Sequence, residues 1–587
     1  MKPITLFDLF DRFRYITVFT VSLLFQGSRS AWIYSPLSCK RQSARSKVIR
    51  VMSASASAEI VNGAIRHLNK EMLPEGMLPE RTRILTSDEV EPMKDGTGSV
   101  VYWMQRDVRT SDNWALTLAS SLAQQRQVPL RVIYALPPPP EAASRRDDGS
   151  RPPAMVDLPM TRRHADFLLG GLEGVQKEFR AHHIPFHVVM APSHDKVGKT
   201  VCDLLTSSTY KATTIVSDFS PLRQYRQWME LQALPLLEKN QTPFYQVDAH
   251  NVVPVWTASP KREVGARTLR TKINKVISDY LTDILDAELS KLVNGKKKAD
   301  LIMPDFDRKE YEDYLRIDES VPSVSWAIPG TKAGMDQFDY FVRNSLAKYD
   351  TLRNDPTHAK ITSNLSPWTN HGHISFQKVA LLTKKLNKHA NGTASFLEEG
   401  IIRRELSDNY VYYTPNDYDA LTAAAGWAKE TLDTHSSDPR EYVYSLEDLE
   451  EGKTHDDLWN AAQLQVVQEG QMHGFMRMYW AKKILEWTES PEVALDFAQY
   501  FNDKYALDGK DPNGFVGVGW SIMGIHDQGW KEREVFGKIR YMNYAGCKRK
   551  FKVDTFVGRY PQADKNVGAA GSKRKAVASN SNSKKIK

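Results

Sequence analysis

The first half of the chain alternates short apolar runs with stretches of helical periodicity. Runs rich in β-branched and aromatic residues predict strands over Ser99–Met104, Leu130–Ala135, Phe186–Met190, Thr214–Ser217 and Phe244–Val247. Apolar residues at helical spacing predict helices between these strands, over Asn113–Gln125, Arg162–Arg180 and Leu222–Glu238. Because strands alternate with helices, we predict a Rossmann-like, parallel, doubly wound α/β domain. No glycine-rich phosphate-binding motif opens the first helix, so an ordinary dinucleotide or P-loop site is not expected.

The second half of the chain is predicted to be helical. After about Arg267 the strand pattern fades, and helical periodicity covers Gln337–Lys348, Ile374–Leu386, Phe396–Asn409, Leu458–Gln468 and Met472–Trp487. The predicted fold class is therefore an α/β domain followed by an all-α domain. We predict a largely disordered N-terminal extension over 1–95, the α/β domain over 96–265, an interdomain linker over 266–330, the helical domain over 331–560 and a disordered basic tail over 561–587.

The two ends of the chain carry different targeting patterns. Ile16–Phe25 is an apolar run too short to cross a bilayer, and no acidic residue occurs from 26 to 58. This pattern indicates an organelle-targeting leader, with an extension that carries no address as the alternative. Lys573–Lys575 and Lys584–Lys587 could form a two-part nuclear signal or a DNA-contacting tail. We expect the nucleus, a plastid or a mitochondrion, and no membrane span in the mature protein.

Composition narrows the chemistry. The net charge of +8 suits a polyanionic partner, and 13 Trp, 24 Tyr and 22 Phe indicate stacking surfaces or aromatic packing. The three cysteines, Cys39, Cys202 and Cys547, lie far apart, which excludes a four-cysteine metal site and argues against a disulfide framework. Redox or other demanding chemistry would therefore need an organic cofactor, and no metal site is expected.

Several segments resemble class II cyclobutane pyrimidine dimer photolyases. The resemblance rests on Tyr102–Asp107, Asp112–Leu116, Val247–Pro254, Met472–Trp487, Asn502–Tyr505 and Gly524–Phe551, and it runs from about Val100 to Val557. It implies an antenna-like α/β domain, a helical FAD-binding domain, and blue-light repair of dimers in UV-damaged DNA. In this family, excited reduced FAD gives an electron to a flipped-out dimer. A second chromophore, a deazaflavin or a folate, and a monomeric state are further expectations.

The resemblance assigns the flavin site to two groups of residues. It implies that the phosphates and ribityl chain are held by Tyr349, Thr362, Ser363, Asn364, Leu365 and Ser366. Hydroxyl side chains and loop amides before a helix suit a pyrophosphate, although the same residues could be an ordinary helix cap. Arg477 and Asp508 are implied beside the ring, where a guanidinium favours an anionic flavin, or they are a surface ion pair. Asn502 is implied to face N5, or it caps a helix.

Three tryptophans resemble the electron-transfer chain of the family. Trp480 and Trp487 are seven residues apart and therefore share one face of a predicted helix. The resemblance adds Trp459. Indole can be oxidised, and closely spaced rings can pass an electron from the surface to the flavin. A buried aromatic stripe is the alternative interpretation.

The resemblance also assigns a lesion pocket and a DNA surface. Glu399 is implied to hydrogen-bond the dimer, and Trp520 and Met478 to pack against it; these three and Asn502 are the predicted catalytic residues. Without the resemblance, Glu399 is a helix-face carboxylate and the other two are core residues. The predicted phosphate or pocket-rim contacts are Arg353, Arg403, Arg540, Lys548 and Arg549, although basic runs are commonly solvated faces.

One segment departs from the family pattern. Trp368-Thr369-Asn370-His371-Gly372 stands where the family has an aromatic residue, Leu, His, an aromatic residue and Gly. Met523 stands where relatives often carry a smaller residue. Two other functions remain open from the sequence: a cryptochrome-like photoreceptor without repair activity, and a DNA-binding protein that has lost its flavin.

Overall fold

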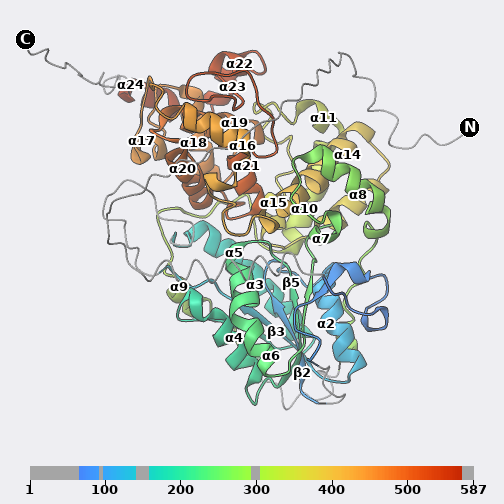
Figure 1. Ribbon diagram of the computed structural model, residues 1–587. Helices are drawn as coiled ribbons and strands as arrows, with labels where there is room; N and C mark the ends of the chain where they lie inside the picture. Colours follow the sequence, from blue (N-terminus) through green and yellow to red (C-terminus); the bar gives the residue numbers. More distant parts are fainter. Residues whose placement is uncertain (1–64, 91–96, 141–157, 293–303, 571–587) are drawn as a thin grey trace, which may run out of the picture. The chain divides into compact units, whose positions relative to one another are not determined.

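The computed structural model describes residues 65–90, 97–140, 158–292 and 304–570 (Figure 1). Its N-terminal half holds a six-stranded sheet in the order β1-β6-β5-β2-β3-β4. The strands are β1 (Thr82–Ile84), β2 (Ser99–Met104), β3 (Leu130–Ala135), β4 (Phe186–Val189), β5 (Ala212–Asp218) and β6 (Phe244–Val247). All neighbours are parallel except β1, which runs antiparallel to β6. The predicted parallel, doubly wound sheet is confirmed.

Helices cover both faces of the sheet, and successive side chains of each central strand point alternately to the two faces. The helices are α2 (Trp114–Gln125), α3 (Arg162–Ala181), α4 (Val197–Thr206), α5 (Arg223–Arg226), the π-helical turn η5 (Gln227–Ala233) and α6 (Leu234–Lys239). Tyr102 and Val132 point to a core shared with α2 and α3. Their neighbours Trp103 and Ile133 point to a core shared with α4, η5 and α6. Because side chains alternate with a period of two, the fully apolar runs of β2 and β3 are buried on both sides.

The sheet begins earlier than the sequence predicts. Thr82–Ile84 form β1 inside the segment predicted as a disordered extension, with Arg83 paired in register with Gln246 of β6. The Arg83 guanidinium is buried and forms an ion pair with Glu230. A strand of three residues with a central arginine has no apolar alternation to detect, because its charge is neutralised by tertiary partners. The boundary of the α/β domain therefore lies before residue 82.

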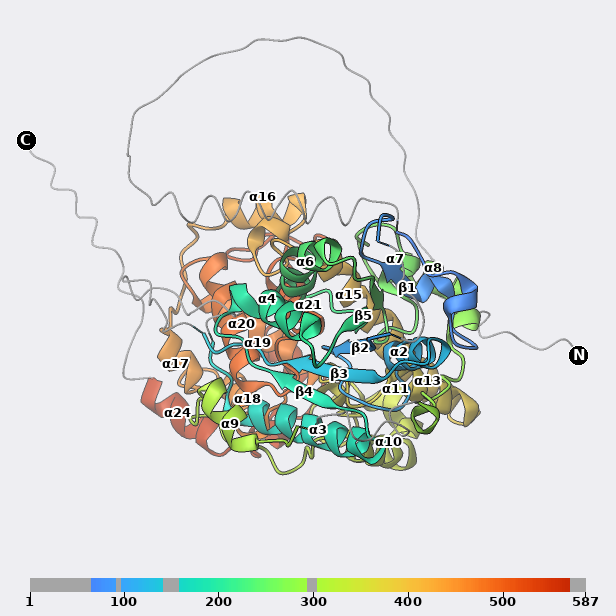
Figure 2. The ribbon, with the colours of Figure 1, turned by 90° about the horizontal axis from the view of Figure 1, so that it is seen from below.

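The C-terminal half is helical (Figures 1 and 2). Its first helices are α7 (Val255–Ala258), α8 (Ala266–Tyr280), α9 (Arg308–Leu315), α10 (Thr331–Asn344), α11 (Tyr349–Leu352), α12 (Ser366–Asn370), α13 (Phe376–Lys385), α14 (Ala390–Leu397) and α15 (Arg404–Tyr412). The others are α16 (Gly426–Thr434), α17 (Leu446–Glu450), α18 (Asp457–Glu469), α19 (Gly474–Trp487), α20 (Pro491–Tyr505), α21 (Pro512–Ile522), α22 (Tyr544–Lys548), α23 (Val553–Val557) and α24 (Gln562–Ala570). The segment predicted as a linker thus contains α8 and α9, and α24 lies in the predicted tail.

A π-helical turn interrupts the helix predicted over Phe396–Asn409. The turn η10 (Glu398–Arg403) lies between α14 and α15 and carries Glu399. Turns of this kind widen a helix locally and occur frequently at functional sites. The apolar periodicity continues through the turn, so the sequence alone predicted one uninterrupted helix.

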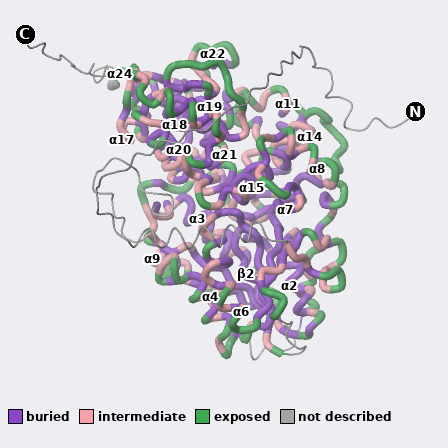
Figure 3. The backbone as a smooth tube through the Cα atoms, in the orientation of Figure 1, coloured by how far each residue is buried: buried purple, intermediate pink, exposed green. Residues whose placement is uncertain are grey.

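Buried ion pairs join the sheet to the helical half. Arg106, which follows β2, donates to Asp408 of α15 at 2.6 Å and lies 3.3 Å from Asp511 at the start of α21. Asn251 donates to the same Asp408 carboxylate at 2.9 Å. Arg106 and Asp408 are both buried, and the two carboxylates raise the pKa of Arg106 despite its desolvation. This pairing fixes where α15 and α21 stand relative to the carboxyl ends of the strands. Both helices are largely buried (Figure 3).

The predicted leader and the basic clusters of the tail lie outside the described residues. Within the described ranges, no helix combines the length and apolar character needed to cross a membrane. Cys202 and Cys547 are buried free thiols, and Cys39 lies outside the described ranges.

Candidate functional site

A cavity opens among the helices of the C-terminal half. It holds about 410 Å³ of empty space, part of it open to solvent, and its walls come from α18, α19, α20 and α21. The lining residues are Val466, Met472, Arg477, Trp480, Ala481, Asn502, Asn513, Gly514, Gly517 and Val518. Three residues that the sequence predicted for two separate roles, Arg477, Asn502 and Trp480, therefore face one space.

Arg477 is held at the cavity wall by two side chains. Its guanidinium donates to Asp508 at 2.6 Å and to the Asn502 amide oxygen at 3.4 Å. It also donates to the backbone carbonyl of Met472 at 3.1 Å. A planar guanidinium with its other donors occupied has little rotational freedom, so its orientation toward the cavity is preorganised. The structure thus brings the predicted pair Arg477–Asp508 together with Asn502.

Two glycines of α21 shape the opposite wall. A Cβ at Gly514 would lie 2.7 Å from the Asn502 amide nitrogen, closer than real contacts allow. A Cβ at Gly517 would meet nothing within 4 Å, so this position leaves open space beside the cavity. Asn502 is 7% exposed, and its amide nitrogen donates to Asp503 at 3.0 Å. The glycines therefore leave a flat wall and fix one amide against it, which suits a planar ring.

The predicted phosphate segment is tied to the same loop as Asp508. Asn370 donates through its amide to the carbonyl of Gly509 at 2.9 Å. Upstream, the Thr362 hydroxyl donates to Asn364 at 2.7 Å, and Asn364 takes a left-handed backbone at φ 53°. Leu365 is buried, whereas Ser366 is exposed at the start of α12. The helix α12, which begins at Ser366, is thus joined through Asn370 to the loop that carries Asp508.

The atypical segment Trp368–Gly372 also packs in the core, in addition to forming the hydrogen bond from Asn370 to Gly509. Trp368 is buried and donates from its indole nitrogen to the carbonyl of Ile328 at 2.8 Å. Gly372 has φ 67°, and a Cβ there would meet the Arg106 carbonyl oxygen at 2.1 Å. The segment therefore keeps the backbone geometry of a tight turn, and its unusual side chains point into the core or toward Gly509.

Tyr349 lies with Arg353 and Glu399 in a second group. Arg353 forms an ion pair with Glu399 at 2.9 Å, and its guanidinium lies 5.9 Å from the centre of the Tyr349 ring. Burial raises the pKa of Tyr349 to about 12, and the Glu399 charge adds to this shift. Burial lowers the pKa of His473, at the start of α19, to about 4, and the nearby charge of Asp355 and backbone of Arg353 oppose this shift. This group is therefore adjacent to the helix that carries Arg477.

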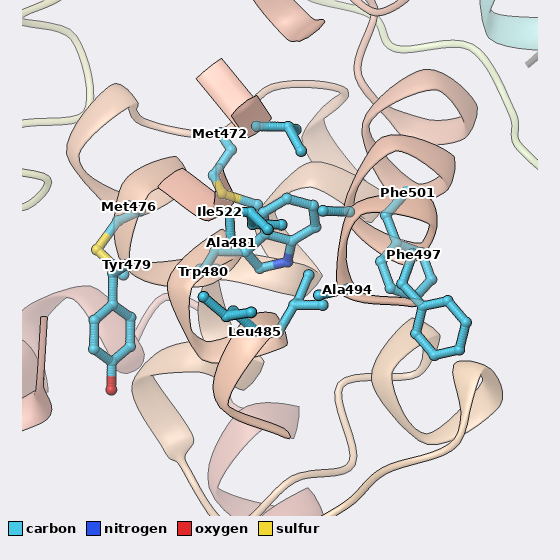
Figure 4. Packing of buried hydrophobic residues seen from close by; sticks show 14 of the residues in the cluster. Met472, Met476, Tyr479, Trp480, Ala481, Leu485, Ala494, Phe497, Phe501 and Ile522 are labelled. Atoms are coloured by element: carbon cyan, nitrogen blue, oxygen red, sulfur yellow. The ribbon is translucent and has the colours of Figure 1, made fainter. Parts of the chain in front are cut away.

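The three predicted electron-transfer tryptophans are in contact. The Trp459 indole nitrogen donates to the backbone carbonyl of Trp480 at 3.0 Å, and the Trp459 and Trp487 rings lie 5.8 Å apart. The Trp480 indole donates to Gln463 at 2.8 Å. Figure 4 shows the Trp480 ring among Ala481, Ile522 and other apolar side chains. Trp480, which lines the cavity, is thus linked to Trp459 by a hydrogen bond, and Trp459 to Trp487 by a ring contact.

The predicted lesion and DNA residues do not form one contact network. Glu399 pairs with Arg353, and within the described residues no hydrogen bond or ion pair joins it to Trp520 or Met478. Both of those side chains are half-buried. The basic residues are scattered: Arg403 lies 3.5 Å from Glu398, Arg540 stacks on Trp520 and Trp530, and Lys548 and Arg549 are exposed on and after α22. A ligand would have to bring these groups together.

The sequence missed a second and larger cavity, at the carboxyl ends of β2 and β3. It holds about 1140 Å³ of empty space, part of it open to solvent, and Tyr134, Pro137 and Lys510 are among its lining residues. The Gln105 side chain is 2% exposed, and neither its oxygen nor its nitrogen has a hydrogen-bond partner within the described residues. The strand order changes direction between β5 and β2, which is where ligands bind in doubly wound sheets.

Two solved structures of low sequence identity share this fold. A bacterial class III photolyase from Agrobacterium tumefaciens superposes with a TM-score of 0.58 at 18% identity, covering 83% of this chain and 92% of that one. A cryptochrome from Synechocystis sp. PCC6803 superposes with a TM-score of 0.60 at 14% identity, covering 81% and 92%. The fold is therefore that of the photolyases and cryptochromes, and by itself it does not separate the two.

Sequence comparison makes that separation. The DNA photolyase family model matches residues 100–290. A deoxyribodipyrimidine photo-lyase from Potorous tridactylus is 45% identical over 488 residues, which cover 83% of this chain and 85% of the relative. This chain belongs to the DNA photolyase family. The resemblance and the fold class predicted from the sequence are confirmed.

Proposed function

We propose that this protein repairs cyclobutane pyrimidine dimers in DNA, using blue light and bound reduced FAD. The observation that carries the proposal is the single cavity that Arg477, Asn502 and Trp480 share, in a chain 45% identical to a deoxyribodipyrimidine photo-lyase. The Arg477 guanidinium, the Asn502 amide and the Trp480 indole all line this one cavity.

The residues of the cavity fit a flavin. The flat wall made by Gly514 and Gly517 accepts the ring system, and the Arg477 guanidinium favours negative charge at its edge. Asn502 can donate to or accept from a ring nitrogen, because an amide offers both. Tyr349 and the segment 362–366 would hold the ribityl chain and phosphates through hydroxyls and backbone amides. Reduced FAD, when bound and excited, supplies one electron at low potential and takes it back after bond cleavage.

The three tryptophans keep the flavin site supplied with electrons. Trp480 would give one electron across the cavity wall, Trp459 would refill Trp480, and Trp487 would refill Trp459. The Trp459 indole N–H donates to the Trp480 carbonyl oxygen, and the Trp480 indole N–H donates to the Gln463 amide oxygen. These neutral acceptors stabilise an oxidised indole. Trp487 is 2% exposed, so a thiol or other small external reductant would have to restore it across the side chains that cover it.

Binding of damaged DNA would bring the residues of the lesion pocket together. A flipped-out dimer would pack on Trp520 and Met478, and the Glu399 carboxyl would hydrogen-bond its carbonyl and amide edge. Arg353, Arg403, Arg540, Lys548 and Arg549 supply positive charge for the phosphates around the flipped site. The sequence-based expectation of a monomer in contact with damaged DNA is retained here as part of the proposal.

The second cavity is a candidate site for an antenna chromophore. The unpartnered Gln105 amide can pair with the lactam edge that deazaflavins and pterins both present. Asn370, His371, Gly509 and Lys510 line this cavity beside the loop that carries Asp508. A chromophore bound there would lie next to the flavin site, close enough to pass excitation energy. The assignment is tested by titrating the purified protein and its Gln105→Leu variant with each chromophore class and following binding by absorbance.

The alternative function is a photoreceptor on the same scaffold. The presence of Glu399, Trp520 and Arg540, together with the 45% identity to a photo-lyase, favours repair over signalling. The compartment is proposed from sequence alone: nucleus, plastid or mitochondrion, through segments that lie outside the described residues.

The experiment that tests the proposal compares the two parts of the site. The purified protein should carry a flavin absorbance that Asn502→Ala perturbs and Glu399→Ala does not. Both variants should lose repair of a dimer-containing oligonucleotide under blue light. A protein that binds flavin and damaged DNA but repairs nothing would support the photoreceptor, and a colourless protein that cannot take up flavin would contradict both functions.

A further inference from the structure

Trp520 lies against two cations. The Lys482 ammonium lies 4.8 Å from the centre of the Trp520 ring, and the Arg540 guanidinium lies 5.7 Å from it. Arg540 continues outward and lies 4.7 Å from the ring of Trp530, which is 44% exposed. Cations and indoles therefore alternate from the interior to the surface. The sequence assigned Trp520 and Arg540 to lesion and DNA contacts, and it assigned no role to Lys482.

Lys482 is unusual among the lysines of the helical half. It is 0% exposed on α19, and its ammonium donates to the backbone carbonyl of Ser521 at 3.0 Å. No carboxylate lies within ion-pair distance of it in the part of the chain that the structure describes. Burial lowers its pKa to about 7; Arg540 lowers it further, and Asp527 opposes this. A buried lysine without a carboxylate is costly to keep, so a role beyond packing is expected of it.

The indoles of the aromatic path have different surroundings. Trp480 and Trp459 donate to neutral oxygens, at Gln463 and at the Trp480 carbonyl. Trp487 has a lysine 5.5 Å from its ring, but that lysine, Lys483, is paired with Glu486 at 2.5 Å. The path indoles therefore face neutral or neutralised partners, whereas Trp520 faces two cations that have no carboxylate partner among the described residues.

Trp520 is close enough to the flavin cavity to compete with the path. It follows Gly517 by three residues on α21, so both lie on one face of the helix. Gly517 lines the cavity directly. Trp520 is also the indole proposed to touch the dimer, where an unwanted electron donor would interfere with repair.

We propose that Lys482 is a positioning residue that acts through Trp520: its buried positive charge keeps this indole from giving up an electron, so that oxidation follows Trp480 instead. Loss of an electron from Trp520 would create a positive charge between two cations, which Coulomb repulsion opposes strongly at low dielectric. The same loss from Trp480 is opposed less, because the cation that shares its cavity, Arg477, is paired with Asp508 at 2.6 Å. This inference rests on the proposed function, because it needs a bound flavin that accepts the electron.

The source of the electron that reduces the flavin can be followed in a series of variants. When oxidised flavin is illuminated, one electron leaves the Trp480 indole for the flavin, and an added thiol returns one electron to the path. With Trp480→Phe this route is closed. If Lys482 protects Trp520, adding Lys482→Met should let Trp520 supply the electron, and adding Trp520→Phe should close the route again.

The expected result is a rise of about tenfold or more in flavin photoreduction rate from Trp480→Phe to Trp480→Phe/Lys482→Met. Lys482→Arg in the same background keeps a charge and should stay slow. In the Trp480→Phe protein itself, photoreduction should quicken as pH rises from 6 to 8.5, because the ammonium, faced by Asp527 and Arg540, loses its proton in that range. A merely structural role of Lys482 predicts no such pH profile.

A second readout does not depend on flavin absorbance. After illumination in air, peptide mass spectrometry should find oxidised Trp520 in the Lys482→Met protein and not in the parent. Equal photoreduction and equal Trp520 oxidation with and without Lys482 would overturn the inference while leaving repair intact. Absence of bound flavin or of repair in the unmodified protein would instead contradict the proposed function.

Discussion

The Trp459 indole nitrogen donates a hydrogen bond to the backbone carbonyl of Trp480 at 3.0 Å. The bond crosses from α18 to α19, so it fixes the separation of two helices and of the two rings they carry. The neighbouring rings of Trp459 and Trp487 lie 5.8 Å apart at 67°. Sequence spacing alone places Trp480 and Trp487 on one helix face but cannot place Trp459 between them. That placement turns three buried aromatics into a path.

Interrupting the path at its middle should separate flavin reduction from repair. Trp459→Phe keeps an aromatic ring in the core and removes both the hydrogen bond and the oxidisable indole. We expect light-driven reduction of bound flavin to fall to a small fraction of its rate, measured by absorbance with a thiol present. Chemically reduced protein should still repair dimers. Trp228→Phe, a buried indole of the α/β half, is the matched control and should change neither rate.

The Arg477–Asp508 pair should govern flavin retention. Asp508→Asn removes a charge-assisted bond of 2.6 Å from a partly buried guanidinium, a loss of about 1.5–3 kcal/mol in orientation energy. We expect flavin to bind about tenfold more weakly, as measured by release on dilution. Asp305→Asn removes an exposed ion pair with Arg180 and should leave retention unchanged. Equal retention in the two variants would place Arg477 outside the flavin site.

The buried pair between the two halves should dominate stability. Asp408→Asn leaves the Arg106 guanidinium with the more distant Asp511 as its one remaining ion-pair partner among the described residues. Removing one member of a buried ion pair typically destabilises by about 3–5 kcal/mol. We expect a large drop in the urea midpoint of the variant. Glu319→Gln, which breaks a surface pair with Arg162, should barely move it.

Buried histidines should make the protein sensitive to acid. The neutral His164 ring donates from Nε2 to the Ala506 carbonyl and accepts at Nδ1 from the Thr161 hydroxyl, and burial lowers its pKa from 6.5 to about 3. The unfolded chain protonates this ring below about pH 6.5 and the folded one does not, so the stability it contributes above pH 6.5 is lost as pH falls. His164→Gln should reduce proton uptake on unfolding by about one between pH 6.5 and 5. The slope of thermal midpoint against pH, compared with the unmodified protein, measures this.

The sheet was largely predictable because its strands are continuous apolar runs. Ser99–Met104, Leu130–Ala135 and Phe244–Val247 were predicted with the bounds that the structure shows, since both faces of these strands are buried. The strand Thr82–Ile84 was missed because Arg83 is neutralised by Glu230, a partner 147 residues away. No local pattern encodes such a pairing.

The candidate site was predictable only in part. The resemblance named Arg477, Asn502 and Asp508, and the structure brings them together. It gave no sign that Arg353 and Glu399 pair with each other, because the π-helical turn that presents Glu399 is set by tertiary packing. Lys482 could have been noticed, since it follows the apolar residues MYWA within the run MYWAKKILEW, but its stacking on Trp520 depends on how α19 and α21 pack.

The most direct test of the account is light-dependent repair. Photoreduced protein is mixed with a duplex oligonucleotide containing one thymine dimer, and intact thymines are counted by chromatography in light and in darkness. The account predicts repair only under illumination, with a rate that follows the absorbance of the reduced flavin across wavelengths. Repair in darkness, or tight binding of flavin and damaged DNA with no repair at any wavelength, would contradict it.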